Sequence, residues 1–357
     1  MPRKGVSGFA DVSVIIAAYR AAGTIGRTLA SIAAQTLKPK EVVVVDDGST
    51  DGTREAAEAC APDMQGIRLK VLRTEDNRGA GAARNRATAE SSQSILAFLD
   101  ADDEWLPAKL DRSLAVFDEG GPVLVAHDYL TSDGECQRHH HCERRFLEGA
   151  DPFVQLYRKG YIASCSVVAR RDAVIAAGGF DEGLRNAQDF DLWLAMLRKP
   201  GTRFRVFGEA LLRYHATPGG IMSHTWRRLR CGLSIAARYL PDLKHRPGSP
   251  YMSLWYRITA LHQEAIRAFG AKGEIGNLLV TAAVLPVNLI AVTLRCLAGA
   301  EPARGPKAAA TISAATTAAP ILVATAFLWL WVVAVTGAYI YQFRSFAHPI
   351  LTLLGLT

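Results

Sequence analysis

An acidic triplet, Asp100-Ala101-Asp102, directly follows an apolar run at residues 95–99. Carboxylate oxygens are the ligands that Mg²⁺ and Mn²⁺ prefer, and few protein ligands are needed where phosphate oxygens complete the coordination. A diphosphate is a poor leaving group until its charge is neutralised, so a cation at such a site would assist its departure. The same residues also fit a solvated acidic turn, or a helix start with Asp103 as the N-cap.

A second polar cluster, Asp46-Asp47-Gly48-Ser49, follows the β-branched run at residues 41–45. Gly48 and Gly52 permit a tight turn. A carboxylate that emerges from a buried strand can accept hydrogen bonds from a nucleobase or a ribose. The alternative is a plain strand-to-helix turn, in which Ser49 or Asp51 caps the helix.

Segments with strand and helix patterns alternate around these clusters. Strands are predicted at 12–17, 41–45, 67–72 and 95–99, and helices at 24–35 and 80–90. The β-branched runs are typical of buried parallel strands, and the alternation predicts an α/β domain with a mostly parallel central sheet. Ligands bind at the carboxyl ends of such strands. We therefore expect Ala17-Ala18-Tyr19 and both acidic clusters to lie at one edge.

The composition indicates a folded protein and limits its partners. The chain has 357 residues, 49% hydrophobic and 21% charged, which allows one large domain with an appendage, or two domains. The net charge of +7 suits an anionic substrate or membrane, and no basic run with interleaved aromatic residues supports nucleic acid. The six cysteines form no C-x-x-C pair, which favours a reducing compartment. Residues 1–10 lack the apolar stretch of a secretory signal and are expected to be a tail.

Residues 120–240 have a less regular pattern, and the α/β domain is expected to extend from residue 11 to 245. Strands are predicted at 122–127, 163–169 and 204–207, and helices at 171–177, 189–198 and 226–240. Within the next segment, 246–274, the apolar residues of 251–269 share one helix face. Such a helix is either packed on the domain or interfacial on a membrane.

The region 275–357 is expected to be membrane-associated. Residues 321–341 carry no charge and are long enough to cross a bilayer. Residues 275–294 are also uncharged but contain Asn277, Pro286 and Asn288, so a second span, a re-entrant hairpin and a buried helix all stay open. Basic residues between the two segments favour a single span at 321–341, with everything before it in the cytoplasm.

Five segments resemble the GT-A family 2 of inverting glycosyltransferases in their order and spacing. They are 12–19, 31–36, 45–51 (Val-Asp-Asp-Gly-Ser-Thr-Asp), 81–85 and 99–103 (Leu-Asp-Ala-Asp-Asp). The resemblance implies a nucleotide-sugar-binding domain with a divalent metal, Mg²⁺ or Mn²⁺. It implies that Asp47 and the backbone of Ala17 contact the nucleobase, beside Tyr19. It further implies that Asp100 faces the ribose or sugar, that Asp102 binds the metal, and that Arg84 lies near the nucleotide.

The segment 188–193, Gln-Asp-Phe-Asp-Leu-Trp, resembles the family's Glu-Asp-Tyr-Asp-Leu-Trp, which implies that Asp189 is the catalytic base. Displacement at an anomeric carbon needs a carboxylate on the acceptor side, opposite the leaving diphosphate. An acidic first helical turn is the alternative, and Asp191 is expected to be structural.

A further family pattern, Tyr-Arg-x-His, is altered in this sequence. Its counterpart begins at Arg213-Tyr214-His215, and Thr217 stands where the family's histidine would fall. His215 or His224 is the candidate replacement as a ligand to the metal or diphosphate.

Two other motifs carry less weight. Gly79-Ala80-Gly81 suggests a dinucleotide loop but lacks its final glycine, since Arg84 stands there. The histidine-rich segment 136–142, Cys-Gln-Arg-His-His-His-Cys, fits no standard zinc spacing and is expected to be a surface hairpin, with a metal site as the alternative.

The resemblance therefore implies a membrane-attached enzyme at the cytoplasmic face of the inner membrane. Its expected reaction transfers a hexose from a nucleoside diphosphate sugar to a hydroxyl of a lipid-linked glycan. Overall similarity is to exopolysaccharide transferases of the succinoglycan type. Two alternatives stay open, a transferase that makes a polyprenyl-phosphate sugar and a non-catalytic scaffold that binds sugar nucleotides.

Overall fold

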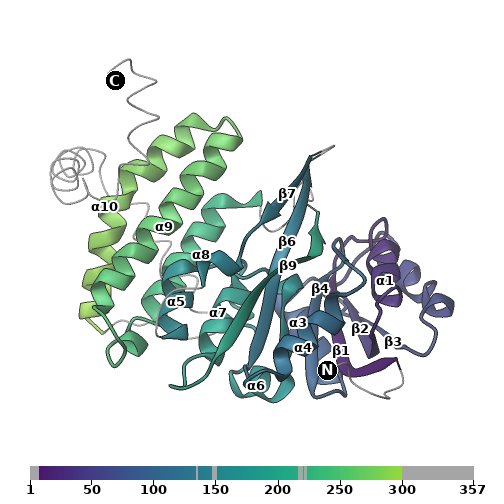
Figure 1. The fold of residues 1–357 in the computed structure, drawn as a ribbon. Helices are drawn as coiled ribbons and strands as arrows, with labels where there is room; N and C mark the ends of the chain where they lie inside the picture. Colours follow the sequence, from purple (N-terminus) through teal and green to yellow (C-terminus); the bar gives the residue numbers. More distant parts are fainter. Residues whose placement is uncertain (1–7, 134–135, 147–150, 216–219, 221–222, 300–357) are drawn as a thin grey trace.

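A central sheet of nine strands organises the protein (Figure 1). The computed structural model describes residues 8–133, 136–146, 151–215, 220 and 223–299, so the span predicted at 321–341 lies outside the described residues. The strands are β1 Phe9–Ala18, β2 Lys38–Asp46, β3 Arg68–Arg73, β4 Ile95–Asp100, β5 Glu104–Trp105, β6 Leu124–Asp133, β7 Cys136–His140, β8 Val168–Arg170 and β9 Phe204–Tyr214. Their order in the sheet is β3-β2-β1-β4-β8-β6-β9-β5, and β7 pairs with β6.

Helices cover both faces of this sheet (Figure 1). They are α1 Ile25–Ala33, α2 Thr53–Glu58, α3 Ala80–Glu90, α4 Lys109–Asp118, α5 Pro152–Lys159, α6 Arg171–Ala176, α7 Gln188–Met196, α8 Thr225–Arg238, α9 Pro250–Ala271 and α10 Ile275–Leu297. Helices α1 and α4 belong to one hydrophobic core, and α5, α7, α8 and α9 belong to the other.

The side chains of the buried strands alternate between these two cores. In β2, Val43 and Val45 face the core that contains α7, whereas Val42 and Val44 face the core that contains α1. The apolar runs of β1 and β4 divide in the same way, because successive side chains of a strand point to opposite faces. Continuous apolar runs are therefore required here, as they are in any sheet covered on both faces.

The predicted α/β fold is confirmed, with a change in the character of the sheet. The pairings of β3, β2, β1 and β4 are parallel, as predicted. Strand β8 pairs antiparallel with both β4 and β6. Strand β7 pairs antiparallel with β6, and β5 pairs antiparallel with β9. Since only β6 and β9 restore a parallel pairing, the complete sheet is mixed and not mostly parallel.

Several element boundaries also differ from the predictions. Strand β1 begins at Phe9, so it takes in two residues of the expected tail at 1–10. The strand expected at 163–169 is a 3₁₀ turn, Ser164–Ser166, followed by the short strand β8. The strand expected at 204–207 continues to Tyr214.

Helix α9 packs against α5, α8 and α10 through the apolar face noted in the sequence.

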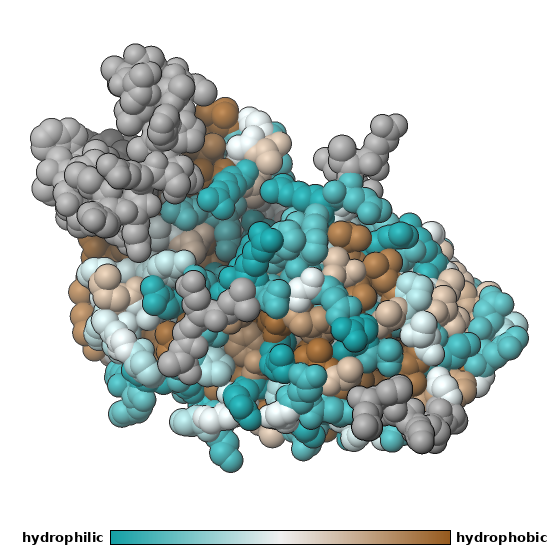
Figure 2. Space-filling view, viewed as in Figure 1, coloured by the Kyte–Doolittle hydropathy of each residue, from teal (hydrophilic) through white to brown (hydrophobic). Residues whose placement is uncertain are grey.

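Helix α10 is long and apolar enough to cross a membrane, by length and composition alone. Its polar residues have partners in the helical layer: Asn288 Nδ2 lies 3.0 Å from His262 Nε2, and Trp226 Nε1 donates to Asn277 Oδ1 at 3.3 Å. Its opposite face is exposed, with Leu279 62%, Leu294 59% and Leu297 63% accessible. Figure 2 shows hydrophobic surface on this side of the molecule.

Helices α7 and α8 are joined by a buried ionic cluster. Arg238 Nη1 lies 2.5 Å from Asp191 Oδ1 and 2.9 Å from Asp181 Oδ2, and all three side chains are buried. Tyr239 also donates its hydroxyl to the backbone carbonyl of Asp191 at 3.0 Å. This agrees with the structural role expected for Asp191.

Replacing Arg238 with methionine should lower the free energy of unfolding by about 3–5 kcal/mol, because two buried carboxylates lose their cation. Arg230→Met is the matched control, since Arg230 is exposed on the same helix. Chemical denaturation of both variants measures the difference. Equal stabilities would show that the cluster does not hold α7 against α8.

Candidate functional site

Three loops meet at the carboxyl edge of the parallel strands. Ala17 of β1 is in register with Val45 of β2 on one side and with Asp100 of β4 on the other. The next residue, Ala18, is in register with Asp46. The structure thus confirms that both acidic clusters and the end of the first strand lie together.

The loop after β1 is tied to the loop after β2. The Arg20 amide donates to Ser49 Oγ at 2.9 Å, and the Ala21 amide donates to Thr53 Oγ1 at 2.8 Å. Arg20 has a φ of 51°, a left-handed conformation that non-glycine residues seldom adopt and that often marks functional loops. Next to it, the Tyr19 side chain is 45% exposed, so it is free to contact a ligand at this edge.

Asp47 is buried and already holds a neighbouring loop. Its Oδ1 accepts from the Arg78 amide at 3.0 Å, and its Oδ2 accepts from the Gly79 amide at 2.7 Å. Gly48, with a φ of +74°, makes room for this loop, because a Cβ there would lie 2.8 Å from the Asp76 carbonyl carbon. Oδ1 also accepts from the Thr74 hydroxyl at 3.1 Å, so three of the roughly four acceptor positions of the carboxylate are filled and one is left for a ligand donor.

Arg84 of α3 connects the triplet to the segment at 188–193. Its guanidinium is buried, lies 2.5 Å from Asp100 Oδ1 and lies against the Phe180 ring, 5.4 Å from its centroid. Asn85 fixes Phe180 by donating to its carbonyl at 2.9 Å and accepting from its amide at 2.8 Å. A buried cation is thus held between an aromatic ring and a carboxylate.

Asp189, in the first turn of α7, is electrostatically coupled to this ion pair. Burial raises the pKa of Asp189 above its ordinary value; Arg84 lowers that pKa, and Asp100 raises it. Helix α7 starts at an unusual position, since Ala187 has a φ of 57°. Gly81 of α3 approaches closely here: a Cβ on it would lie 3.1 Å from Gln188 Nε2. Gln188 itself is buried and donates to the Leu184 carbonyl, as a structural residue would.

The acidic loop has the donor set of a hard-cation site. Asp100, Asp102 and Asp103 lie within four consecutive positions, and the ligand atoms of Asp100, Asp103 and Cys165 lie within 4.8 Å of one another. Burial raises the pKa of Asp103 well above its usual range, and the charges of Asp100 and Asp102 raise it further. Crowded carboxylates of this kind fit Mg²⁺ or Mn²⁺, whereas a thiol does not suit such cations.

His215 reaches this loop through its backbone. Its amide donates to Asp103 Oδ1 at 2.9 Å, whereas its ring Nε2 lies 2.8 Å from Glu104 Oε1. Arg27 completes this group, with its Nε 3.1 Å from the same Glu104 oxygen. The other candidate, His224, is exposed at the start of α8, and Thr217 lies outside the described residues.

Three residues near the acidic loop were missed in the sequence: the buried Cys165 and the partly buried Tyr161 and Tyr214. Burial raises the pKa of the Cys165 thiol, and Asp100 and Asp103 raise it further. Burial also raises the pKa values of Tyr161 and Tyr214, with contributions from Asp189 for Tyr161 and from Asp103 for Tyr214. Single tyrosines and cysteines belong to no motif that could be recognised by its spacing. Only the folded chain therefore shows that they lie near the acidic loop.

Comparisons with known proteins identify a family and a set of relatives. Residues 13–178 match the family described as Glycosyl transferase family 2. The succinoglycan biosynthesis protein ExoU of Rhizobium meliloti is 36% identical over 207 residues, which are 55% of this chain and 59% of ExoU. The UDP-Glc:alpha-D-GlcNAc-diphosphoundecaprenol beta-1,3-glucosyltransferase WfgD of Escherichia coli is 26% identical over 61% of this chain and 82% of its own. The match therefore spans less than two thirds of ExoU.

Solved structures share the fold. TarS 1–349 of S. aureus, in complex with UDP-GlcNAc, has a TM-score of 0.59 at 21% identity and covers 78% of this chain and 81% of its own. The mannosyltransferase PcManGT of Pyrobaculum calidifontis, in complex with GDP-Man and Mn²⁺, has a TM-score of 0.53 at 22% identity and covers 80% and 87%. Residues 13–178 of the chain therefore match glycosyl transferase family 2, and the chain has the GT-A fold that these solved structures share.

Proposed function

We propose that this protein transfers a hexose, with inversion, from a nucleoside diphosphate sugar to a hydroxyl of a lipid-linked glycan. The observation that supports this most is the grouping of Arg84 and Asp189 with Asp100 of the acidic loop. The carboxylates of Asp100 and Asp103 could hold a metal and its diphosphate, and the separate carboxyl of Asp189, whose pKa is raised, could act on the acceptor. The relatives ExoU and WfgD suggest a role in exopolysaccharide or cell-surface polysaccharide biosynthesis.

The proposed donor site lies at the carboxyl edge of β1, β2 and β4. Asp47 and the Ala17 backbone would contact the nucleobase, beside the exposed ring of Tyr19. Asp100 would face the ribose or sugar, with Arg84 fixing its carboxylate. Complexes of TarS with UDP-GlcNAc and of PcManGT with GDP-Man support a nucleotide-sugar donor of this general class.

Asp102 is the proposed ligand of a divalent cation, supported by the crowded carboxylates of its loop and by the Mn²⁺ in the PcManGT complex. Such a cation would neutralise the diphosphate as it leaves. His215 is the proposed further ligand; its ring would have to turn away from Glu104 to take that role.

Asp189 is the proposed general base. Its carboxylate would take the proton of the acceptor hydroxyl while the acceptor oxygen bonds to the anomeric carbon. The bond from that carbon to the diphosphate oxygen would break, and the nucleoside diphosphate would leave with the electron pair. Arg84 would keep Asp189 ionised, because its cation lowers the pKa that burial raises.

The proposed membrane attachment fits a lipid-linked acceptor. Helix α10 exposes apolar side chains on one face and is packed on α8 and α9 by the other, so in this arrangement it suits the membrane surface better than a full crossing. The segment at 321–341 stays the proposed span, with the catalytic domain at the cytoplasmic face of the inner membrane. The acceptor of WfgD, a diphosphoundecaprenol-linked sugar, is of the chemical class proposed.

Asp189→Asn should lower kcat by about 10²–10⁴-fold with little change in donor affinity, because the amide cannot accept the proton. Asp172→Asn is the control: this exposed aspartate also lies in the first turn of a helix. Single-turnover kinetics and titration with nucleotide separate the two effects. Normal turnover in Asp189→Asn would eliminate this residue as the base.

Arg84→Met should shift the acid limb of the kcat/KM profile to higher pH, because a cation that lowers the pKa of Asp189 is removed. Arg84→Lys should restore part of the shift, and Arg86→Met, exposed on the same helix, should leave the profile unchanged. An acid limb that stays in place, or moves to lower pH, contradicts the coupling.

A panel of UDP, GDP and dTDP sugars tests the reaction itself, in membranes that contain the full chain. We expect nucleotide release from one donor class, dependent on lipid extract, abolished by a chelator and restored by Mn²⁺. Product formed on added polyprenyl phosphate would instead indicate the polyprenyl-phosphate transferase. Nucleotide binding without release from any donor would indicate the non-catalytic scaffold.

A further inference from the structure

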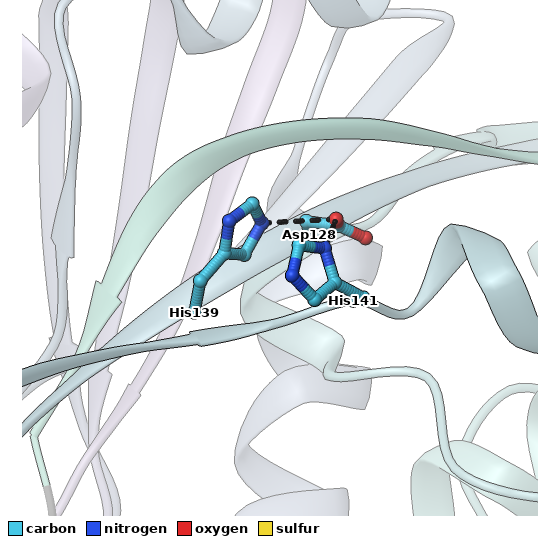
Figure 3. A group of neighbouring side chains, drawn as sticks. All are labelled: Asp128, His139 and His141. Atoms are coloured by element: carbon cyan, nitrogen blue, oxygen red, sulfur yellow. Dashed lines mark hydrogen bonds and ion pairs between the residues drawn. The ribbon is translucent and has the colours of Figure 1, made fainter.

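The histidine-rich segment at 136–142 becomes part of a three-residue cluster in the folded chain. His139, in β7, and His141, immediately after it, are separated by one residue, so both side chains lie on the same face of the hairpin formed by β6 and β7. Figure 3 shows both rings directed at the carboxylate of Asp128, which lies on β6. The pairing of Tyr129 with His140 sets this register, because it places Asp128 opposite His141.

The distances within this cluster fit metal coordination. His139 Nε2 lies 3.0 Å and His141 Nδ1 lies 3.4 Å from the same oxygen, Asp128 Oδ2, and the three ligand atoms lie within 4.8 Å of one another. Bonds of about 2.0–2.1 Å from a tetrahedral zinc ion separate its ligands by roughly 3.3 Å. Two imidazoles and one carboxylate therefore already stand at about the spacing that such an ion requires.

The surroundings of Asp128 also favour a cation. Its carboxylate is buried, with an exposed fraction of 1%, whereas His139 and His141 are open to solvent. The second oxygen, Oδ1, accepts the Glu143 amide at 2.9 Å, which is the outer hydrogen bond that orients a metal-bound carboxylate. A cation would compensate the buried charge, and the exposed histidines leave it a path from solvent.

A break in the sheet register lies at the same point. His127 pairs with Phe207, but Asp128 pairs with Ala210, so two residues of β9, Gly208 and Glu209, are left between these pairs. Bulges of this kind redirect a side chain and recur beside functional sites. The local distortion occurs where Asp128 has to face both histidines.

We propose that Asp128, His139 and His141 form a second metal site, for a borderline divalent transition metal such as Zn²⁺. Imidazole nitrogens select metals of this class, whereas the carboxylates of the acidic loop suit Mg²⁺ or Mn²⁺. Three protein ligands leave one position for water. The ion would fasten β6 to the end of β7 and to the residues that follow, so its role is to stabilise this hairpin.

The site lies on the opposite face of the hairpin from the donor region. Tyr129 and His140, which are next to the ligands in the chain, lie on the face toward the donor region. Their rings stack with centroids 4.5 Å apart, and the Tyr129 ring contacts the Tyr214 ring edge-on with centroids 6.1 Å apart. The pKa of Tyr214 is raised in part by Asp103 and Asp100, which places this tyrosine close to the acidic loop. The proposal therefore does not depend on the proposed reaction.

Zinc binding by the purified full chain tests the proposal, after metal is stripped with a chelator and with excess Mg²⁺ present to occupy carboxylate sites. Competition against a chromophoric chelator should show one tightly bound zinc ion per chain in the wild type. His139→Gln and His141→Gln should each weaken it by more than about 100-fold, since even the outer partner of a ligand contributes 10–100-fold. His140→Gln is the matched control, because it lies between the two ligands on the other face, and it should bind as the wild type does.

Thermal unfolding gives a second readout. Zn²⁺ should raise the Tm of the wild type and of His140→Gln, but not of His139→Gln or His141→Gln, because only a bound native state gains stability. Absorption of Co²⁺ bound in place of zinc reports nitrogen ligation in the unaltered protein, so poorly folding variants would not obscure the result. Wild-type protein that binds neither metal, or equal zinc affinity in all three variants, would overturn the proposal.

Discussion

The ion pair between Arg84 and Asp100 is the interaction on which the arrangement of the site depends. A buried guanidinium is costly without a compensating charge, so Arg84 and the end of β4 have to stay together. Phe180 covers the guanidinium from the other side and is itself fixed by Asn85. Because Phe180 also packs edge-on against Phe98 of β4 and against Trp193 of α7, the same contact that positions Arg84 positions the helix that carries Asp189.

This coupling gives one cation two tasks. Arg84 holds the Asp100 carboxylate in place and lowers the pKa of Asp189, which burial would otherwise raise further. The charge of Asp100 acts on Asp189 in the opposite direction, because it raises the pKa of that carboxyl. In the proposed reaction Asp189 would have to stay ionised beside a diphosphate, and a shared cation would supply the compensation that solvent cannot supply there.

The first hundred residues could be predicted from the sequence, because their order follows from local patterns. Strands β1, β2 and β4 contain continuous apolar runs, and those of β2 and β4 end at aspartate, so both the fold and the meeting of the loops follow from the same residues. The second half could not, since β8 has three residues and β5 has two, and their pairing partners lie far away in the chain. Two missed helices did carry signals: Leu110, Leu114 and Phe117 share one face of α4, and Asp151 caps α5 ahead of Pro152.

Spacing did not reveal every neighbour of these sites, because spacing records only neighbours in sequence. The histidine-rich segment fits no zinc pattern when its own residues are counted, yet the third ligand lies eleven positions before His139, on the strand that pairs with it. The same reason explains Cys165, which comes from the turn between α5 and β8 to stand beside Asp103. It also explains His215, whose ring is held by Glu104 because β5 and β9 pair there. In each case a strand pairing decides which side chains meet, so chemistry that depends on pairing becomes visible only when the register is known.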